Sequence, residues 1–172
     1  MNEIANAVGI KKASLYSHYA GKDELFLAVF EDVTSEYRQL FERLLEASNS
    51  MEIQDKLRYH FEGYILYFYR NPEMAYFLNQ SLLHVPSELY EKLRSIYLSR
   101  EKHYRKRLED IFKEGIQQRI IREGDPTKKV WSFKTKRDGV IGWLLGSPDV
   151  TEEHIREFWD DFWFGAMERN RG

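Results

Sequence analysis

The chain has 172 residues, enough for one domain or two small ones, and its net charge of −2 carries no overall nucleic-acid signature. It contains no cysteine, which excludes disulfides, thiolate metal sites and cysteine nucleophiles. Because the start lacks an apolar signal core and the apolar runs are too short to cross a bilayer, we expect a cytoplasmic protein.

Helix-forming residues dominate the sequence, glycine and proline are scarce, and no stretch alternates with the period of a strand. The predicted fold class is therefore all-α, with about eight helices divided by breakers and caps. Residues 1–22 hold three lysines against one glutamate, a local charge of +2 that leaves −4 for the remaining chain. A basic N-terminal segment followed by an acidic remainder is typical of a DNA-binding module attached to a second unit.

Local signals divide the first half of the chain into five helices. A short amphipathic helix is predicted over 1–8, ended by Gly9, and a second short helix over 11–19. Residues 21–24 open a long helix that runs to about residue 47, with acidic side chains favourably placed at its first turn. An aromatic-rich helix follows over 53–69, and Pro72 starts a shorter helix that ends near His84.

Three more helices are expected in the second half. The segment Pro86-Ser87-Glu88 starts a long helix whose apolar positions keep helical spacing to Phe112. After a turn over 122–125, Pro126 opens a helix to about Leu145. Residues 146–148 (Gly-Ser-Pro) break it, and residues 151–153 cap a last helix that ends near Asn170.

The first two short helices carry the clearest functional signal. A helix, a glycine turn and a second helix too polar to be core describe a helix-turn-helix, whose second helix enters the major groove of DNA. Ala5 is small where the two helices cross, and Ile4, Ile10 and Leu15 are expected to form their core. An ordinary helical hairpin is the alternative interpretation of the same residues.

Residues 4–30 resemble the TetR family of transcriptional regulators. The likeness lies in an Ile-Ala pair, Ala-Val-Gly-Ile, Leu15-Tyr16-x-His18-Tyr19 and Gly21-Lys22-x-Glu24-Leu25. It implies a partial helix-turn-helix domain of residues 1–30, joined by a long helix to a ligand-binding and dimerisation domain of residues 31–172. The family has a further helix before this motif, whereas this chain starts inside the family's second helix, so Leu25 and Val29 are expected to lack a cover.

The resemblance also implies where DNA is contacted. The first turn of the recognition helix reads bases, and Lys12 is the candidate for guanine O6 and N7. The family's Tyr-x-His pair and the next helix's opening lysine hold phosphates, although core packing is an equal alternative for Tyr16. The candidate DNA-binding residues are Lys11, Lys12, Ala13, Ser14, Tyr16, His18 and Lys22.

In the same family an effector binds among the helices after the connecting helix. Aromatic residues at helical spacing predict a lining for a mainly apolar, ring-bearing molecule, and a few polar residues are possible contacts. The alternative is that these aromatics are plain core. The candidates are Tyr64, Phe68, Phe77, Tyr97, Tyr104 and Trp131, with Gln80, His84 and Lys134 as polar contacts.

The last two helices resemble the family's dimerisation pair. They carry more large apolar groups than we expect one protomer to bury, which favours a face shared with a second copy. The candidate interface residues are Trp143, Phe158, Trp159, Phe162 and Trp163, beside Phe164 and Met167. A basic stretch over 128–137 indicates only a solvated face.

The function that the sequence predicts is a TetR-type repressor released from its operator by a small effector. The expected partners are double-stranded DNA, the effector and a second copy, with no membrane, metal or cofactor. No histidine follows a glutamate by three positions, and neither a P-loop nor a G-x-S-x-G motif is present, so an enzyme is not expected. A helical small-molecule or lipid carrier that does not bind DNA is the alternative.

Overall fold

The computed structural model describes residues 1–85, 87–147 and 149–167, and these residues form eight helices and one isolated bridge between Ile121 and Met167. The helices are α1 (Asn2–Ala7), α2 (Lys12–Tyr16), α3 (Lys22–Ala47), α4 (Ile53–Arg70), α5 (Pro72–Leu83), α6 (Ser87–Gln117), α7 (Pro126–Gly146) and α8 (Glu152–Ala166). The predicted all-α class is confirmed. Pro86, Pro148 and Asn170, where helix ends were expected, lie outside the described residues.

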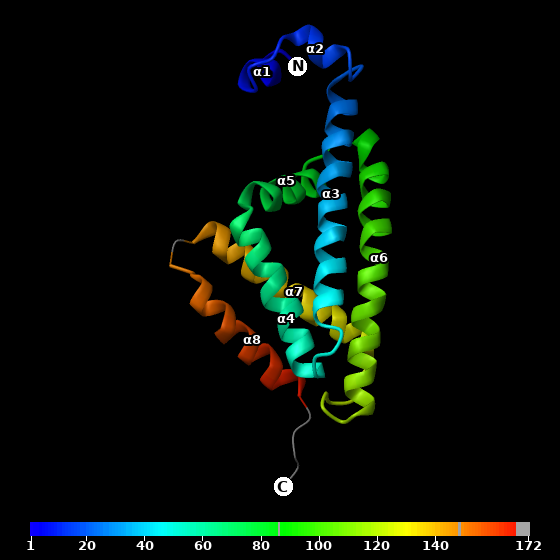
Figure 1. Ribbon diagram of the computed structural model, residues 1–172, viewed down its shortest axis with the longest axis vertical. Coiled ribbons are helices and arrows are strands. Elements are labelled where there is room, and N and C mark those ends of the chain that lie inside the picture. Colours follow the sequence, from blue (N-terminus) through cyan, green and yellow to red (C-terminus); the bar gives the residue numbers. More distant parts are fainter. Residues whose placement is uncertain (86, 148, 168–172) are drawn as a thin grey trace.

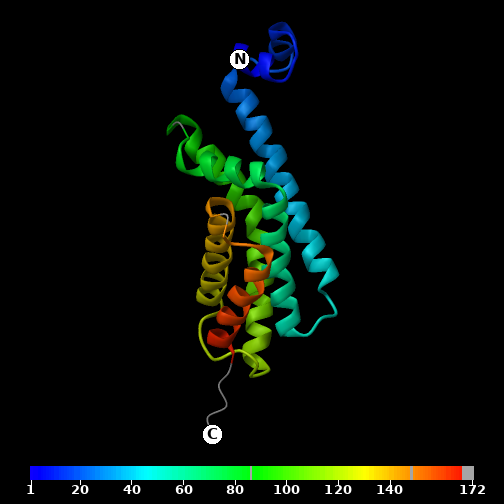
Figure 2. The same ribbon diagram turned by 90° about the vertical axis from the view of Figure 1, so that its left-hand side faces the viewer.

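The helices form a small head and a larger bundle. Figure 1 shows α1 and α2 at one end of the molecule, attached to the N-terminal end of α3, while α3 runs on beside α6. Viewed from the side, α4 lies between α3 and the α7–α8 pair, α6 packs directly on α7, and α5 crosses the upper part of the bundle (Figure 2). One continuous helix, α3, therefore belongs to both the head and the bundle.

Local capping chemistry explains why the helices begin where they do. Pro72 and Pro126 occupy first-turn positions, where the missing N–H of proline costs no hydrogen bond. The Asp125 carboxylate accepts the backbone N–H of Thr127 at 2.9 Å. Thr151 begins α8 with a capping box in which His154 takes the place usually held by a glutamate or glutamine. These local signals are what made the helix starts predictable.

Two helix ends differ from the sequence prediction. The second helix ends at Tyr16 rather than Tyr19, and the N–H of Ala20 is already engaged by the carboxylate of Glu24 on the next helix. The last helix ends at Ala166 because Met167 is extended and forms the bridge with Ile121. At the end of α8, the carbonyl of Ala166 accepts the N–H of Arg122 at 3.1 Å, a contact from another segment.

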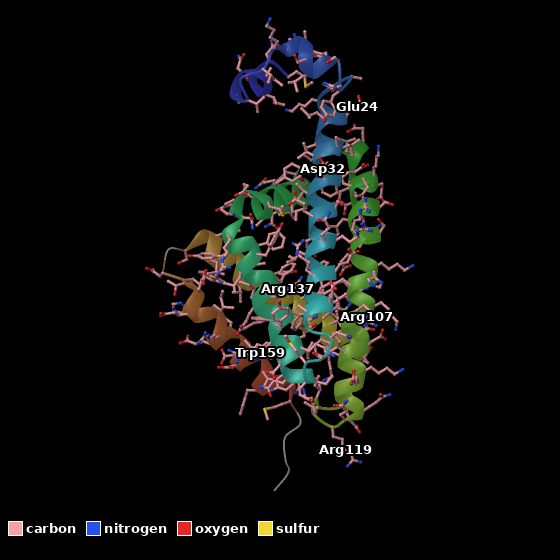
Figure 3. All side chains as sticks on the ribbon, viewed as in Figure 1. Glu24, Asp32, Arg107, Arg119, Arg137 and Trp159 are labelled. Atoms are coloured by element: carbon pink, nitrogen blue, oxygen red, sulfur yellow. The ribbon has the colours of Figure 1, made fainter. Side chains whose placement is uncertain are left out.

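The bundle core is largely aromatic. Phe41 of α3 stacks on Tyr104 of α6, with ring centroids 3.6 Å apart and planes 5° from parallel. On the other side of α4, Phe61 packs against Phe133 of α7 and Trp159 of α8. Each such ring contributes about 1.5–3 kcal/mol through burial. Trp159 is fully enclosed, pointing from α8 toward α4 (Figure 3).

Candidate functional site

The head has the geometry of a helix-turn-helix. Ala5 and Leu15 are buried between α1 and α2, and the N–H of Ile10 donates to the carbonyl of Ala5 at 3.0 Å. Gly9 turns the chain with a φ of 72°, a conformation that side chains with a Cβ rarely adopt. Ile10 was expected in this core but is 44% exposed, because the turn carries it outward while Leu15 fills the crossing.

The residues predicted to contact DNA share one property: all of them are exposed. They lie on α2, on its N-cap Lys11, or between α2 and the start of α3. Tyr16 is 47% exposed and lies under the Lys12 ammonium, 5.5 Å from ring centroid to Nζ, so core packing does not explain it. The surface combines three lysines with a phenol, an imidazole and a hydroxyl, the groups that bind phosphates and base edges.

An open apolar groove lies on the inner side of the head. Leu25 is half-buried and Val29 is exposed at this groove. Phe77 of α5 reaches this groove and packs against Phe26 of α3, with ring centroids 5.6 Å apart. The groove has a volume of about 370 Å³ and is lined by Ile4, Val8, Leu15, Lys22, Leu25, Phe26, Val29 and Phe77.

A second cavity is lined by residues from five helices of the bundle and is open to solvent on one side, where Asn79 and Asp138 are exposed. Its volume is about 210 Å³. Tyr37 comes from α3, Tyr97 from α6 and Asp138 from α7, and their polar atoms share the space with several apolar side chains. The full lining is Tyr37, Tyr64, Phe68, Ala75, Leu78, Asn79, Tyr97, Asp138 and Ile141. A mostly apolar space with a few polar groups is the usual form of a small-molecule site.

Three hydroxyl groups meet at this cavity. The hydroxyl of Tyr64 lies 3.4 Å from that of Tyr37, which lies 3.5 Å from that of Tyr97. Burial raises the pKa of all three phenols, while the positive charge of Arg137 acts on each in the opposite direction. All three therefore remain protonated at neutral pH and offer both donors and acceptors to a guest.

Arg137 is completely buried next to the cavity. Its guanidinium carbon lies 3.4 Å from the centroid of the Tyr64 ring, and its Nε and Nη2 donate to Asp138 Oδ1 at 3.0 and 2.9 Å. Figure 3 places it at the centre of the bundle, where α7 passes behind α4. Lys134, one turn earlier, is also buried and forms an ion pair with Glu101 of α6. The expectation of a solvated basic face is wrong at these two positions, because the partners come from α6 and from the next residue.

The structure brings only part of the predicted ligand set together. Tyr64, Phe68 and Tyr97 line the bundle cavity. Tyr104 is buried elsewhere, bonded to His60, and Lys134 is held by Glu101. The remaining candidates point away from the cavity: Phe77 faces the head groove, and Gln80, His84 and Trp131 are exposed. Tyr37, Asn79 and Asp138 were missed; only the aromatic character of Tyr37 was a usable signal.

The predicted dimer residues also separate into two groups. Trp159 and Trp163 are buried and Phe158 and Phe162 pack against the core, so the expectation that one protomer could not bury them is wrong. Trp143, in contrast, is 65% exposed on α7. Beside it in sequence, Gly139 and Gly142 face open space. The exposed large apolar side chains of this region are Trp131, Trp143, Phe164 and Met167.

Two further searches concern other classes of site. Among the described residues, no group of three or more His, Asp or Glu side chains is arranged to hold a metal ion. None of the helices in the described part of the chain is long and apolar enough to cross a membrane.

A helix-turn-helix on a long helix that continues into a cavity-bearing bundle defines a ligand-binding, DNA-binding class of regulator. Residues 1–29 match the family described as "Bacterial regulatory proteins, tetR family". An uncharacterized HTH-type transcriptional regulator of Bacillus subtilis (strain 168), YvaF, is 36% identical over 58 residues; the match spans 34% of this chain and 30% of that relative.

Two solved structures extend the likeness to the whole chain. The TetR family regulator PfmR from Thermus thermophilus has a TM-score of 0.74 at 22% identity, covering 98% of this chain and 88% of its own. AibR, in complex with isovaleryl coenzyme A and operator DNA, has a TM-score of 0.69 at 26% identity, covering 96% and 85%. Residues 1–29 therefore resemble the DNA-binding region of the TetR family, and the chain as a whole has the fold of solved TetR family regulators.

Proposed function

We propose that this protein is a dimeric repressor that binds operator DNA through α2 and releases it when a small, mainly apolar molecule enters the bundle cavity. The observation that carries this proposal is that α3 holds both sites. The helix begins at Lys22, beside the exposed recognition helix, and it lines the cavity with Tyr37. These two residues are about 22 Å apart along one helix.

The head supports base recognition by α2 and phosphate binding around it. Lys12, Ala13 and Ser14 form the first turn of α2, and in this proposal they read base edges in the major groove. Tyr16, His18 and Lys22 flank that turn and hold phosphates, with Lys11 adding positive charge. The functional division that we propose is residues 1–30 for DNA and 31–172 for effector and dimer contacts, although α3 crosses the boundary.

A physical route connects the cavity with the head through α5. Ala75 and Leu78 line the cavity from α5, and Phe77 of the same helix packs against Phe26 and Phe30 of α3. A guest that displaces α5 therefore acts on α3 close to the head. The structure of AibR contains both isovaleryl coenzyme A and operator DNA, which supports an effector role for this fold.

A second copy is needed to present two recognition helices to one duplex. We place the interface on the outer side of α7 and α8, around Trp143, because an exposed indole beside open glycine positions suits close helix packing. The dimer must hold its recognition helices about 34–36 Å apart, or a multiple of that, to enter successive major grooves. Such a repressor acts in the cytoplasm, and we assign it no enzymatic activity.

Selection from a random duplex pool tests the DNA-binding half. We expect the wild-type chain to enrich a palindromic site and the Lys12→Ala/Lys22→Ala variant to enrich none. The variant Lys92→Ala/Lys102→Ala, which removes two exposed lysines of α6, serves as the matched control and should select the same site as wild type. A folded wild-type dimer that enriches no sequence would contradict the proposal and favour a ligand carrier.

A further inference from the structure

We propose that the bundle cavity takes a small organic carboxylate, with a ring or short hydrocarbon body, whose acid group pairs with Arg137 in place of Asp138. This inference rests on the proposed effector role of the same cavity and names the chemical class of the guest. The mainly apolar effector of the proposed function is then a molecule that carries a single negative charge.

Arg137 is a permanent positive charge with incomplete pairing. Its side chain has an exposed fraction of 0%, and Nη1 makes no well-formed hydrogen bond although it is shielded from solvent. Burial raises the pKa of the Tyr104 phenol, and a weaker contact of that hydroxyl with the Arg137 guanidinium acts to lower it. A guanidinium cannot lose its proton in a protein, so the charge stays in the bundle at every accessible pH. A buried N–H without a partner is costly, which favours any guest that brings an additional acceptor.

Asp138 is a poor match for this guanidinium. Both of its hydrogen bonds from Arg137 end on the same oxygen, Oδ1, so the pair lacks the two parallel bonds of a full fork. Its side chain is 51% exposed and lines the cavity. Asp138 can therefore turn into water at low cost, and a guest carboxylate can take its position with both oxygens. The exchange replaces one carboxylate by another and leaves the local charge balanced.

The cavity walls can donate hydrogen bonds to an anion. Burial keeps the phenol groups of Tyr37, Tyr64 and Tyr97 protonated as donors, while the charges of Arg137 and Asp138 act on them in opposite directions. An ammonium guest would have Asp138 as its nearest carboxylate, already engaged by Arg137, and would place a second positive charge beside the first. Asn79 adds an amide donor at the rim.

The size of the cavity limits the body of the guest. A cavity of about 150 Å³ accommodates benzene. The volume of about 210 Å³ therefore suits one ring, or a chain of similar bulk, with a carboxylate attached. Any larger substituent has to leave between Asn79 and Asp138, the exposed members of the lining.

Calorimetric titration of the full chain with three ring compounds of equal size and different charge tests the proposal. Benzoate should bind at least about tenfold more tightly than neutral benzamide, with benzylamine the weakest. Asp138→Asn, at a half-exposed position, should raise benzoate affinity severalfold because the internal competitor is gone. Asp32→Asn, which removes an exposed acid of α3 distant from Arg137 (Figure 3), is the matched control and should change nothing.

A second variant tests the guanidinium directly. Arg137→Met should bind benzoate and benzamide equally, provided that circular dichroism shows a folded chain. If this variant does not fold, the response of benzoate to Asp138→Asn still decides the question. Equal affinities for benzoate and benzamide in wild type, or benzylamine binding that Asp138→Asn abolishes, would overturn the anionic guest.

Parallel measurements of duplex affinity separate this inference from the proposed function. If benzamide or isovaleryl coenzyme A releases the selected duplex and benzoate does not bind, the carboxylate is overturned while the effector role stands. If benzoate binds as expected but duplex affinity is unchanged, the carboxylate site is supported and the repressor mechanism fails.

Discussion

Lowering the pH should destabilise this protein through one buried histidine, His60. The ring is fully buried on α4, with Nε2 3.0 Å from the Ser48 hydroxyl and Nδ1 3.0 Å from the Tyr104 hydroxyl. Burial lowers the pKa of His60 to about 3, and the positive charges of Arg137 and Lys56 act in the same direction. A neutral imidazole donates at one nitrogen and accepts at the other, so it satisfies both contacts without a charge.

The size of the effect follows from the difference between the two pKa values. Below the ordinary pKa of 6.5, the unfolded chain protonates His60 while the folded protein does not. Stability from the neutral ring is thus fully present above pH 6.5 and is lost as the pH falls toward 3, by about 1.4 kcal/mol per pH unit. Between about pH 7.5 and about pH 5, His60 alone should lower the free energy of unfolding by about 2 kcal/mol.

Urea denaturation at these two pH values measures the loss. In His60→Gln, whose amide can still bond to Ser48 and Tyr104, the pH-dependent loss should be about 2 kcal/mol smaller than in wild type. His103→Gln, at an exposed position on α6, is the matched control and should keep the wild-type dependence. Equal pH dependence in wild type and His60→Gln would refute the argument, because every other titrating group is common to both chains.

Four further variants test the DNA contacts, the dimer interface and the α5 route. Lys22→Ala should weaken binding to selected and unrelated duplexes alike and reduce the slope of log affinity against log salt concentration by about one unit per protomer. An unchanged slope would show that Lys22 does not contact phosphate. Lys12→Ala should cost about 1–3 kcal/mol of binding free energy per half-site on the selected duplex only. Trp143→Asp should shift sedimentation from dimer to monomer, while Tyr90→Asp, at an exposed position on α6, should not; a monomeric wild type would contradict the interface. Phe77→Ala should preserve ligand binding but reduce its effect on duplex affinity, and undiminished coupling would exclude the α5 route.

The elements of this fold were predictable because their signals are local. Pro72, Pro126 and Thr151 act on the backbone within one turn of their own positions, and all three helix starts were placed within a residue or two. The head was predictable for the same reason, since Gly9 and the polar face of α2 lie within one short segment.

The bundle cavity was less predictable because its determinants are far apart in sequence. Lys134 is buried only because Glu101, 33 residues earlier, supplies its countercharge, and no local pattern shows that pairing. The aromatic content of α4 was recognised, but spacing alone could not separate Tyr64, which lines the cavity, from Tyr104, which bonds to His60. On α8, the spacing of the aromatics could not show that Trp159 is buried within the protomer, because the residue that it packs against, Phe61 of α4, is distant in sequence.

The sites that resisted prediction are the ones that give the cavity its chemistry. Many different apolar side chains could fill the core around this cavity. The guanidinium of Arg137, buried against the Tyr64 ring, instead needs a partner that compensates its positive charge. Here that partner is the adjacent residue, Asp138, which also lines the cavity and reaches solvent. A guest that competes for Arg137 therefore changes the same network that joins α7 to Tyr64 of α4 and Tyr37 of α3. The N-terminal end of α3 is joined to the recognition helix. A guest that replaces Asp138 at Arg137 therefore acts on the helix that also positions the head. By linkage, the factor by which a bound guest lowers DNA affinity must equal the factor by which bound DNA lowers the affinity for the guest.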